Sequence, residues 1–137
     1  MFADYNFVNP VSPACCQVLA TVFDYMEIEK TKDRITCLLT GIITATGGFK
    51  NTHTTADSFE FASFALSSGI NVSNLYRKVF MSMTKEKFEA EKLAMQRMEF
   101  FGDGKVCFTY ITNEDKEKIG VKVGDLDGIV EKGRNIQ

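Results

Sequence analysis

Residues that build zinc sites and disulfide frameworks are scarce in this sequence. Its 137 residues include one histidine and four cysteines, and no two cysteines are spaced as a CxxC pair. A zinc finger would therefore lack ligands, and a secreted disulfide scaffold is usually shorter and denser in cysteine. We interpret the cysteines as reduced thiols of a cytoplasmic protein. They are Cys15, Cys16, Cys37 and Cys107.

An excess of one charge and long apolar runs are also missing. The 16 basic and 18 acidic residues give a net charge of −2. No electrostatic drive toward nucleic acid or an anionic membrane is therefore expected, although a small pocket for one phosphate is not excluded. The longest apolar run, near 38–43, is too short to span a bilayer, and residues 1–6 lack signal-peptide features. We expect a globular cytoplasmic protein without a membrane segment.

Apolar spacing predicts mainly helices over residues 1–82. A short buried strand is expected over 5–8, and Ser12, which precedes a proline, is expected to cap the first helix. That helix is expected to bury a stripe of Cys15, Val18, Leu19, Val22, Phe23 and Met26. Thr31 is expected to cap a second helix that the glycine pair 47–48 ends. Its expected buried face is Ile35, Leu38, Leu39, Ile42 and Ile43.

Two more apolar helices and a charged one are expected next. The first covers 55–69, the second begins at Asn71 or Ser73, and the charged helix, capped by Thr84, includes 85–92. The apolar positions of the first two are Phe59, Phe61, Ala62, Phe64, Ala65, Leu66, Val72, Leu75, Tyr76, Val79, Phe80 and Met83. The charged helix has a weak apolar stripe, so we interpret it as a connector with a large solvated face.

The period of the pattern changes near residue 100. Alternation over 105–111, after the turn residues 102–104, predicts a strand that pairs with 99–101 as a hairpin. Thr112 is expected to cap a short charged helix, and 128–130 to open a last helix. The sequence therefore predicts a helix-rich half, a connecting helix and the beginning of an α+β unit.

The segment 39–49 is the most distinctive candidate for function. It places glycines and hydroxyl side chains just after an apolar helix. Such a turn leaves backbone N–H groups and the hydroxyls of Thr44 and Thr46 free to meet a polar ligand. The alternative is a glycine helix stop whose threonines bond their own backbone. Composition by itself favours this alternative.

His53 and Lys50 are the other candidates for contact with a ligand. His53 is the single imidazole, and a histidine in a polar loop is more often solvated than functional. One lysine, Lys50, is a weak indication of a phosphate contact. The charge run 85–92 is interpreted as a solvated helix face.

The order of these residues resembles the DHH phosphoesterase family, and within it the bacterial nanoRNase and pAp phosphatase group. That group has the pattern T-G-I-x-T-D-T-G-x-F, then N-T-T, then a helix closed by glycine. This chain has TGIITATGGF at 40–49, the threonines 54–55 and Gly-Ile-Asn at 69–71. Segments 105–115 and 127–130 resemble the beginning of the family's C-terminal domain.

The resemblance implies metal-assisted hydrolysis of a phosphate ester. In the family two manganese ions lie among Asp and His ligands and activate a water, and the substrates are short oligoribonucleotides, pAp and dinucleotides. It implies a helix-rich α/β chain: 1–82 as the C-terminal portion of a DHH phosphoesterase domain, 83–97 as a connecting helix, and 98–137 as the beginning of the DHH-associated substrate-binding domain. The expected substrate-binding positions are Thr44, Thr46, Gly47, Lys50, His53 and Thr54.

The sequence departs from the family's pattern at the metal ligands. Ala45 occupies the position of the Asp in T-D-T-G, which binds metal in the family, and His53 replaces the Asn of N-T-T. The family's Asp-rich and Asp-His-His motifs would lie before residue 1, and its glycine- and histidine-rich substrate motif beyond residue 137. Because a methyl group cannot coordinate a cation, we expect no catalytic residue, no bound Mn²⁺ and no hydrolysis by this chain alone.

The leading interpretation is a fragment or degenerate member of the manganese-dependent DHH phosphoesterases, whose full-length relative would act on a nucleotide or short oligonucleotide. The alternative is a non-catalytic module that binds another protein through its helices or binds a nucleotide. Apolar surface left uncovered would favour self-association in either case.

Overall fold

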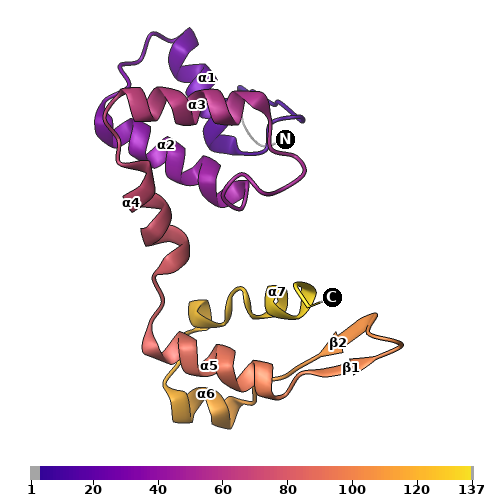
Figure 1. Ribbon diagram of the computed structural model, residues 1–137. Helices are drawn as coiled ribbons and strands as arrows, with labels where there is room; N and C mark the ends of the chain where they lie inside the picture. The colour runs from indigo at the N-terminus through magenta and orange to yellow at the C-terminus, as the bar shows by residue number, and fades with distance from the viewer. Residues whose placement is uncertain (1–3, 137) are drawn as a thin grey trace. The chain divides into compact units, whose positions relative to one another are not determined.

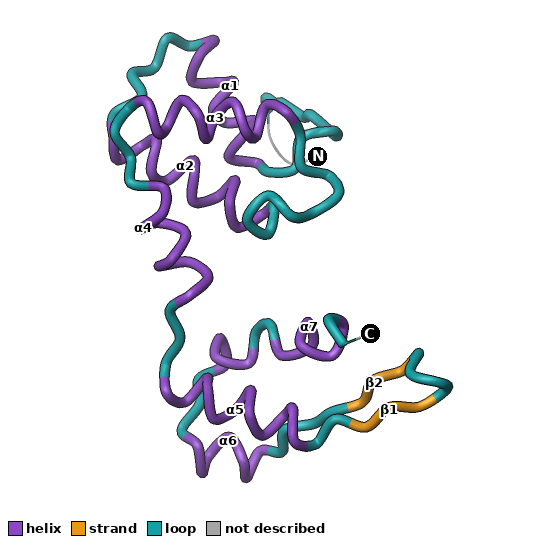
Figure 2. Tube along the Cα trace, viewed as in Figure 1, coloured by secondary structure: helices purple, strands orange, loops and turns teal. Residues whose placement is uncertain are grey.

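The computed structural model describes residues 4–136 and is rich in helices (Figure 1). Strand is confined, in this described part, to one antiparallel hairpin (Figure 2). The elements are α1 (Cys15–Tyr25), α2 (Lys32–Ala45), α3 (Ala56–Ser67), α4 (Val72–Tyr76), the π-helix η1 (Arg77–Met81), α5 (Lys85–Gln96), β1 (Glu99–Phe101), β2 (Val106–Phe108), α6 (Asn113–Ile119), the 3₁₀ helix η2 (Val123–Leu126) and α7 (Ile129–Arg134). The expected helix-rich α/β chain is confirmed.

The chain divides into two compact units, Met1–Ser82 and Met83–Gln137. Helix α5 belongs to the second unit, where it packs against η2, α6 and α7. The assignment of 1–82, 83–97 and 98–137 to parts of a phosphoesterase stays a prediction. None of the described helices is long and apolar enough to cross a membrane.

Helix α2 supplies the centre of the first unit's core. The hydroxyl of Thr31 caps it and accepts a hydrogen bond from the Arg34 amide at 3.4 Å, as expected. Side chains spaced by three and four residues share one side of a helix, and this side of α2 is buried. The predicted buried face is therefore confirmed: Ile35, Leu38, Leu39, Ile42 and Ile43.

Helices α1 and α2 approach closely at Gly41. A Cβ atom built on Gly41 would lie 2.9 Å from the Cβ of Cys16, and closer still to its sulfur. A larger residue at position 41 would therefore hold the two helices apart. Burial also raises the pKa of the Cys16 thiol, so this thiol stays protonated near neutral pH.

The expected buried stripe of α1 is wrong at Cys15, Leu19 and Met26, which are exposed, whereas Phe23 packs against the core as expected. Leu19 is 43% exposed and Met26 is 66% exposed, whereas Gln17 and Ala20 are buried. The spacing of apolar residues could not choose this orientation, because α1 is apolar on more than one side. The side chosen is the one that faces α2 and α3.

A buried polar network explains why a glutamine can lie inside. The Nε2 of Gln17 donates to Thr55 Oγ1 at 3.0 Å, and Ser58 Oγ donates to Gln17 Oε1 at 2.6 Å. Thr55 also caps α3 together with Ser58. Because each polar end of the amide has a partner, burial of Gln17 carries no uncompensated desolvation cost.

Two expectations for the N-terminal segment are also wrong. Residues 5–8 form no strand, and Tyr5 is 95% exposed. Ser12 does not cap α1: its hydroxyl donates to the carbonyl of Ala14 at 3.2 Å, and Ala14 is the extended N-cap residue. The segment has strand-forming residues, but the described structure gives it no neighbouring strand with which to pair.

Helix α3 begins just after Thr55, close to its predicted start, and Gly69, with φ at +79°, follows its end as expected. Only some of the apolar positions expected on this helix face inward. Phe61 and Ala65 are buried, whereas Phe59 and Leu66 are 55% and 60% exposed. Apolar residues lie on both sides of this helix, so the sequence pattern did not specify which side packs inward.

The next helix is shorter and less regular than the spacing predicted. Asn71, one of the two expected caps, accepts a hydrogen bond from the Asn74 amide at 2.8 Å. Helix α4 ends at Tyr76, and the chain continues as the π-helix η1 to Met81. Met83, expected on the apolar stripe, lies beyond the helix and is exposed.

The second unit is built on α5. Ala90 and Ala94 are buried against Ile129 of α7. Glu91 is also buried, and Lys132 of α7 pairs with it at 3.1 Å. A helix with charged residues on most sides therefore packs through its alanines. The predicted Thr84 cap and the helix opening at 128–130 are confirmed.

Asp115 joins the end of α5 to the beginning of α6. It pairs with the guanidinium of Arg97, with one Nη2–Oδ1 contact of 3.1 Å. The expected Thr112 cap is confirmed, because its Oγ1 accepts from the Asp115 amide at 3.1 Å. The Asp115 carboxylate accepts in return from the Thr112 amide at 2.9 Å and hydroxyl at 2.7 Å. The hydrogen bonds from Arg97, followed by those from Thr112, hold the pKa of Asp115 well below its ordinary value.

The predicted hairpin is confirmed. Glu99 pairs with Phe108 and Phe101 pairs with Val106 in an antiparallel register. All six residues of its two strands are exposed. The hairpin is anchored at its base, where the Thr109 hydroxyl donates to the Ala94 carbonyl at 2.6 Å.

Substitution Gly41→Ala is expected to destabilise the first unit. The overlap with Cys16 costs up to about 3 kcal/mol and outweighs the roughly 1 kcal/mol gained in helix propensity. Urea unfolding followed by circular dichroism should show a net loss of stability, partly restored by adding Cys16→Ala. Gly124→Ala is the matched control, because nothing lies within 4 Å of its added Cβ.

Substitution Asp115→Asn is expected to remove an acid-sensitive contribution to stability. The folded pKa of Asp115 is lowered, so its pairing stabilises the fold above the unfolded value, about 3.9. That contribution is lost as the pH falls through the lower folded pKa. The difference in melting temperature between wild type and variant should therefore be constant above about pH 4 and should decrease in stronger acid. A difference that did not change with pH would contradict this role.

Candidate functional site

The turn that follows α2 directs its backbone amides inward. Gly48 N donates to the Ile43 carbonyl at 2.8 Å, and Gly47 N donates to the Thr44 carbonyl at 3.2 Å. The amides of Lys50 and Asn51 both donate to the Thr46 carbonyl at 3.0 Å. These bonds satisfy carbonyls at a helix C-terminus, which glycines in the left-handed region commonly close. The turn therefore offers no row of free amides to an anion.

The two threonine hydroxyls of the turn also bond within it. Thr46 is fully buried, and its Oγ1 donates to the Ile42 carbonyl at 2.7 Å and accepts from the Phe49 amide at 3.1 Å. Thr44 is exposed, and its Oγ1 donates to the Thr40 carbonyl at 2.9 Å. The expectation that these hydroxyls are free donors is wrong. The alternative, a glycine helix stop with threonines bonded to their own backbone, describes the turn.

The glycines of the turn serve packing and backbone geometry. Gly47 and Gly48 have φ angles of +59° and +71°, which favour glycine. A Cβ on Gly48 would lie 2.7 Å from the ring of Tyr76. Phe49 also has a positive φ, +66°, and its ring stacks on Phe59 with centroids 5.0 Å apart. The motif thus joins the end of α2 to α3 and α4.

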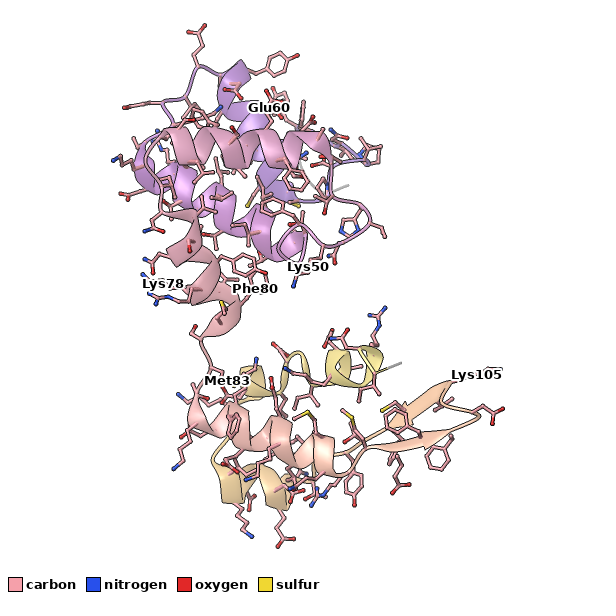
Figure 3. The ribbon with its side chains drawn as sticks, viewed as in Figure 1. Lys50, Glu60, Lys78, Phe80, Met83 and Lys105 are labelled. Atoms are coloured by element: carbon pink, nitrogen blue, oxygen red, sulfur yellow. The ribbon has the colours of Figure 1, made fainter. Side chains whose placement is uncertain are left out.

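The electrostatics of the turn do not favour a phosphate at its backbone. A helix C-terminus carries a partial negative charge, and the turn lies at the C-terminus of α2. Lys50 and His53 are exposed on the loop that follows, and Figure 3 shows Lys50 beside this end of α2. Among residues 4–136, the buried side-chain oxygen or nitrogen without a hydrogen-bond partner is Thr54 Oγ1. A substrate contact by any of the six predicted positions, which are Thr44, Thr46, Gly47, Lys50, His53 and Thr54, stays a prediction.

The residues around Ala45 do not fit a two-metal centre by themselves. Ala45 is exposed, and its carbonyl accepts a hydrogen bond from Asn51 Nδ2 at 3.1 Å. No group of three or more His, Cys, Asp or Glu side chains that could hold a metal ion occurs among the described residues. Hard divalent cations need several oxygen ligands converging on one point, and this chain's described residues supply no such set.

Other hollows lie away from the predicted site. One of about 540 Å³ lies in the second unit along α5 and α6, and Lys85, Lys92, Arg97, Asp115 and Lys118 are among its lining residues. Another, of about 350 Å³, lies between α1 and α3 and is lined by Gln17, Asp57 and Glu60 among others. Sequence patterns gave no signal for either hollow, because each forms where helices from separate segments meet.

Substitution Thr46→Val is expected to lower the free energy of unfolding by about 1–3 kcal/mol, because the Ile42 carbonyl and Phe49 amide lose a buried partner. Thr44→Val is the matched control, since Thr44 is exposed, and should change stability by less than about 0.5 kcal/mol. Urea unfolding of both variants measures the difference. Equal effects would contradict a structural role specific to Thr46.

Comparison with known proteins gives one curated relative of similar sequence. The bifunctional oligoribonuclease and PAP phosphatase NrnA of Thermus thermophilus is 31% identical over 74 residues, which are 54% of this chain. The match covers 23% of that protein, so the chain spans about a quarter of the curated relative's length. No family model matches the sequence.

A solved structure shares the fold. The exopolyphosphatase-related protein from Bacteroides fragilis superposes with a TM-score of 0.90 over 99% of this chain, at 22% identity, and the match covers 41% of that protein. The fold therefore occurs within a protein more than twice as long. Together, the sequence match and the shared fold support the resemblance of this chain to the DHH-type phosphoesterases.

Proposed function

We propose that this chain is a part of a DHH-type phosphoesterase and that the chain by itself does not hydrolyse phosphate esters. The observation that carries the proposal is the alanine at position 45. The motif otherwise keeps its threonines and glycines, yet a methyl group stands where the family has a metal-binding carboxylate. Because residues 4–136 contain no cluster of alternative ligands, this described part of the chain has no set of side chains that could hold two metal ions and activate a water.

The lengths of the relatives support assigning the activity to a longer protein. The chain covers 41% of the exopolyphosphatase-related protein and 23% of NrnA. In this proposal residues 1–82 correspond to the C-terminal portion of the phosphoesterase domain, 83–97 to the connecting helix and 98–137 to the beginning of the substrate-binding domain. The whole enzyme would use Mn²⁺ to cleave phosphate esters in short oligoribonucleotides, pAp or dinucleotides.

The side chains nearest the former site would have different roles. Thr46 and Gly47 shape the turn, because their polar backbone and side-chain groups are bonded within it. Lys50 and His53 are exposed on the adjoining loop and would lie near a substrate phosphate once the rest of the site is present. The charge of Lys50 suits such a contact better than the amides of the turn do.

The purified chain is expected to release no phosphate from pAp above the blank when Mn²⁺ is added. Ala45→Asp restores one ligand of several and is expected to remain inactive for the same reason. A colorimetric phosphate assay measures both, with the Thermus thermophilus NrnA as a positive control and circular dichroism to show that the variant is folded. Reproducible turnover by either form of this chain would overturn the proposal.

An interaction module is the second candidate function, and the exposed apolar side of α1 favours it. Leu19 and its apolar neighbours on α1 line an open apolar hollow. A nucleotide-binding module is less well supported, because the turn at 44–51 uses its amides internally. Calorimetry with pAp separates these alternatives: the interaction module gives no binding heat, whereas a nucleotide-binding module does.

A further inference from the structure

An exposed aromatic side chain lies close to the turn that follows α2. The ring of Tyr76, in α4, covers Gly48, because a Cβ built on that glycine would be 2.7 Å from it. The ring of Phe80, in η1, packs on Tyr76 with centroids 4.8 Å apart. Tyr76 is anchored on the core of the first unit, whereas Phe80 is 40% exposed. Phe80 therefore offers part of its ring to solvent, one ring away from the turn.

Lys50 adds a cation beside these rings. It is exposed, and it follows Gly48 by two positions. Figure 3 shows Phe80 on the side of η1 that is nearer to Lys50, whereas Lys78 lies on the other side. The rings of Tyr76 and Phe80 together with Lys50 are here called the aromatic patch. The patch lies beside the C-terminal end of α2, within the first unit.

The segments that carry the aromatic patch contain no carboxylate. No Asp or Glu occurs over residues 34–56 or over 61–85, although these segments contain the cations Arg34, Lys50, Arg77, Lys78 and Lys85. Asp57 and Glu60, which separate the two segments, line the hollow between α1 and α3 instead. The charges carried by the two segments are therefore of one sign, which favours an anionic ligand.

We infer that the aromatic patch stacks a base of the oligonucleotide substrate while Lys50 pairs with its phosphate. This inference rests on the proposed function and adds to it a residue, Phe80, that contacts the base. Aromatic rings beside cations bind single-stranded nucleic acid in this way, because every base has a π-face and every linkage carries a negative charge. The site does not use the amides of the turn, which are bonded internally.

The backbone around Phe80 is consistent with a functional role. Phe80 belongs to η1, which is a π-helix of five residues. Such irregular turns occur frequently at functional sites. The competing explanation is that Phe80 only covers Tyr76, in which case its ring contributes to stability and not to the affinity for a ligand.

The test is an NMR titration of the purified full chain with a short single-stranded oligoadenylate, without added metal. Phe80→Leu keeps an apolar side chain but removes the ring, and it should raise the Kd at least about fivefold, the low end of the loss of one stacked base. Phe80→Tyr keeps the ring and should stay within about twofold of wild type. Circular dichroism shows whether each variant is folded.

Two matched controls test whether the effect is specific to the aromatic patch. Phe88→Leu changes a phenylalanine of α5 that is 53% exposed, and it should leave the Kd unchanged. Lys50→Ala should weaken binding more than Lys78→Ala does, because a phosphate paired with Lys50 loses a direct contact as well as a nearby charge.

A ligand without bases tests stacking independently of any variant. An abasic oligoribonucleotide of the same length has the same phosphates but offers no π-face. Wild type should bind it at least about fivefold more weakly than the oligoadenylate, and Phe80→Leu should not weaken its binding further.

Three outcomes would contradict the inference: no binding of the oligoadenylate, equal affinity for the abasic ligand, or an unchanged Kd in Phe80→Leu. A loss of stability in Phe80→Leu with unchanged affinity would assign the ring to packing alone. Phosphate release is not measured in any of these titrations. A failure here is therefore distinguishable from turnover by the chain, which bears on the proposed function.

Discussion

The buried face of α2 is the constraint on which the first unit depends. Leu39, Ile42 and Ile43 are excluded from water, so the helix must keep its periodicity up to its last turn. It must then end inside the same core, where unsatisfied carbonyls are costly. Thr46 and the glycines after it satisfy those carbonyls. The turn at 44–51, which the sequence offered as a candidate for ligand binding, is therefore a consequence of how α2 ends.

The motif that carries the family resemblance contains two kinds of residue with separable tasks. Gly41 permits the approach of α1, and Gly48 lies under the ring of Tyr76, so both are required by packing. Position 45 is exposed and packs against little, so alanine there leaves the fold intact. In the proposed assignment, a substitution at position 45 would change a metal ligand without disturbing the core, because an exposed side chain contributes little to packing.

Both units leave apolar surface uncovered. On α1, Leu19 is 43% exposed, and on the hairpin of β1 and β2, Phe101, Val106 and Phe108 are exposed. A two-stranded sheet is marginally stable unless other strands or helices cover it. The solved structure that shares this fold belongs to a longer chain.

The sequence by itself determined where α2, α5 and α6 begin, which side of α2 is buried and where the hairpin lies. The caps at Thr31, Thr84 and Thr112 involve atoms within a few residues of each other, so local patterns reveal them. The tertiary structure decided which side of α1 and α3 packs inward, and that Gln17 is buried beside Ser58. These choices depend on neighbours from distant parts of the chain, which pack into the same core. When a helix is apolar on two sides, the spacing of its apolar residues cannot predict which side is buried.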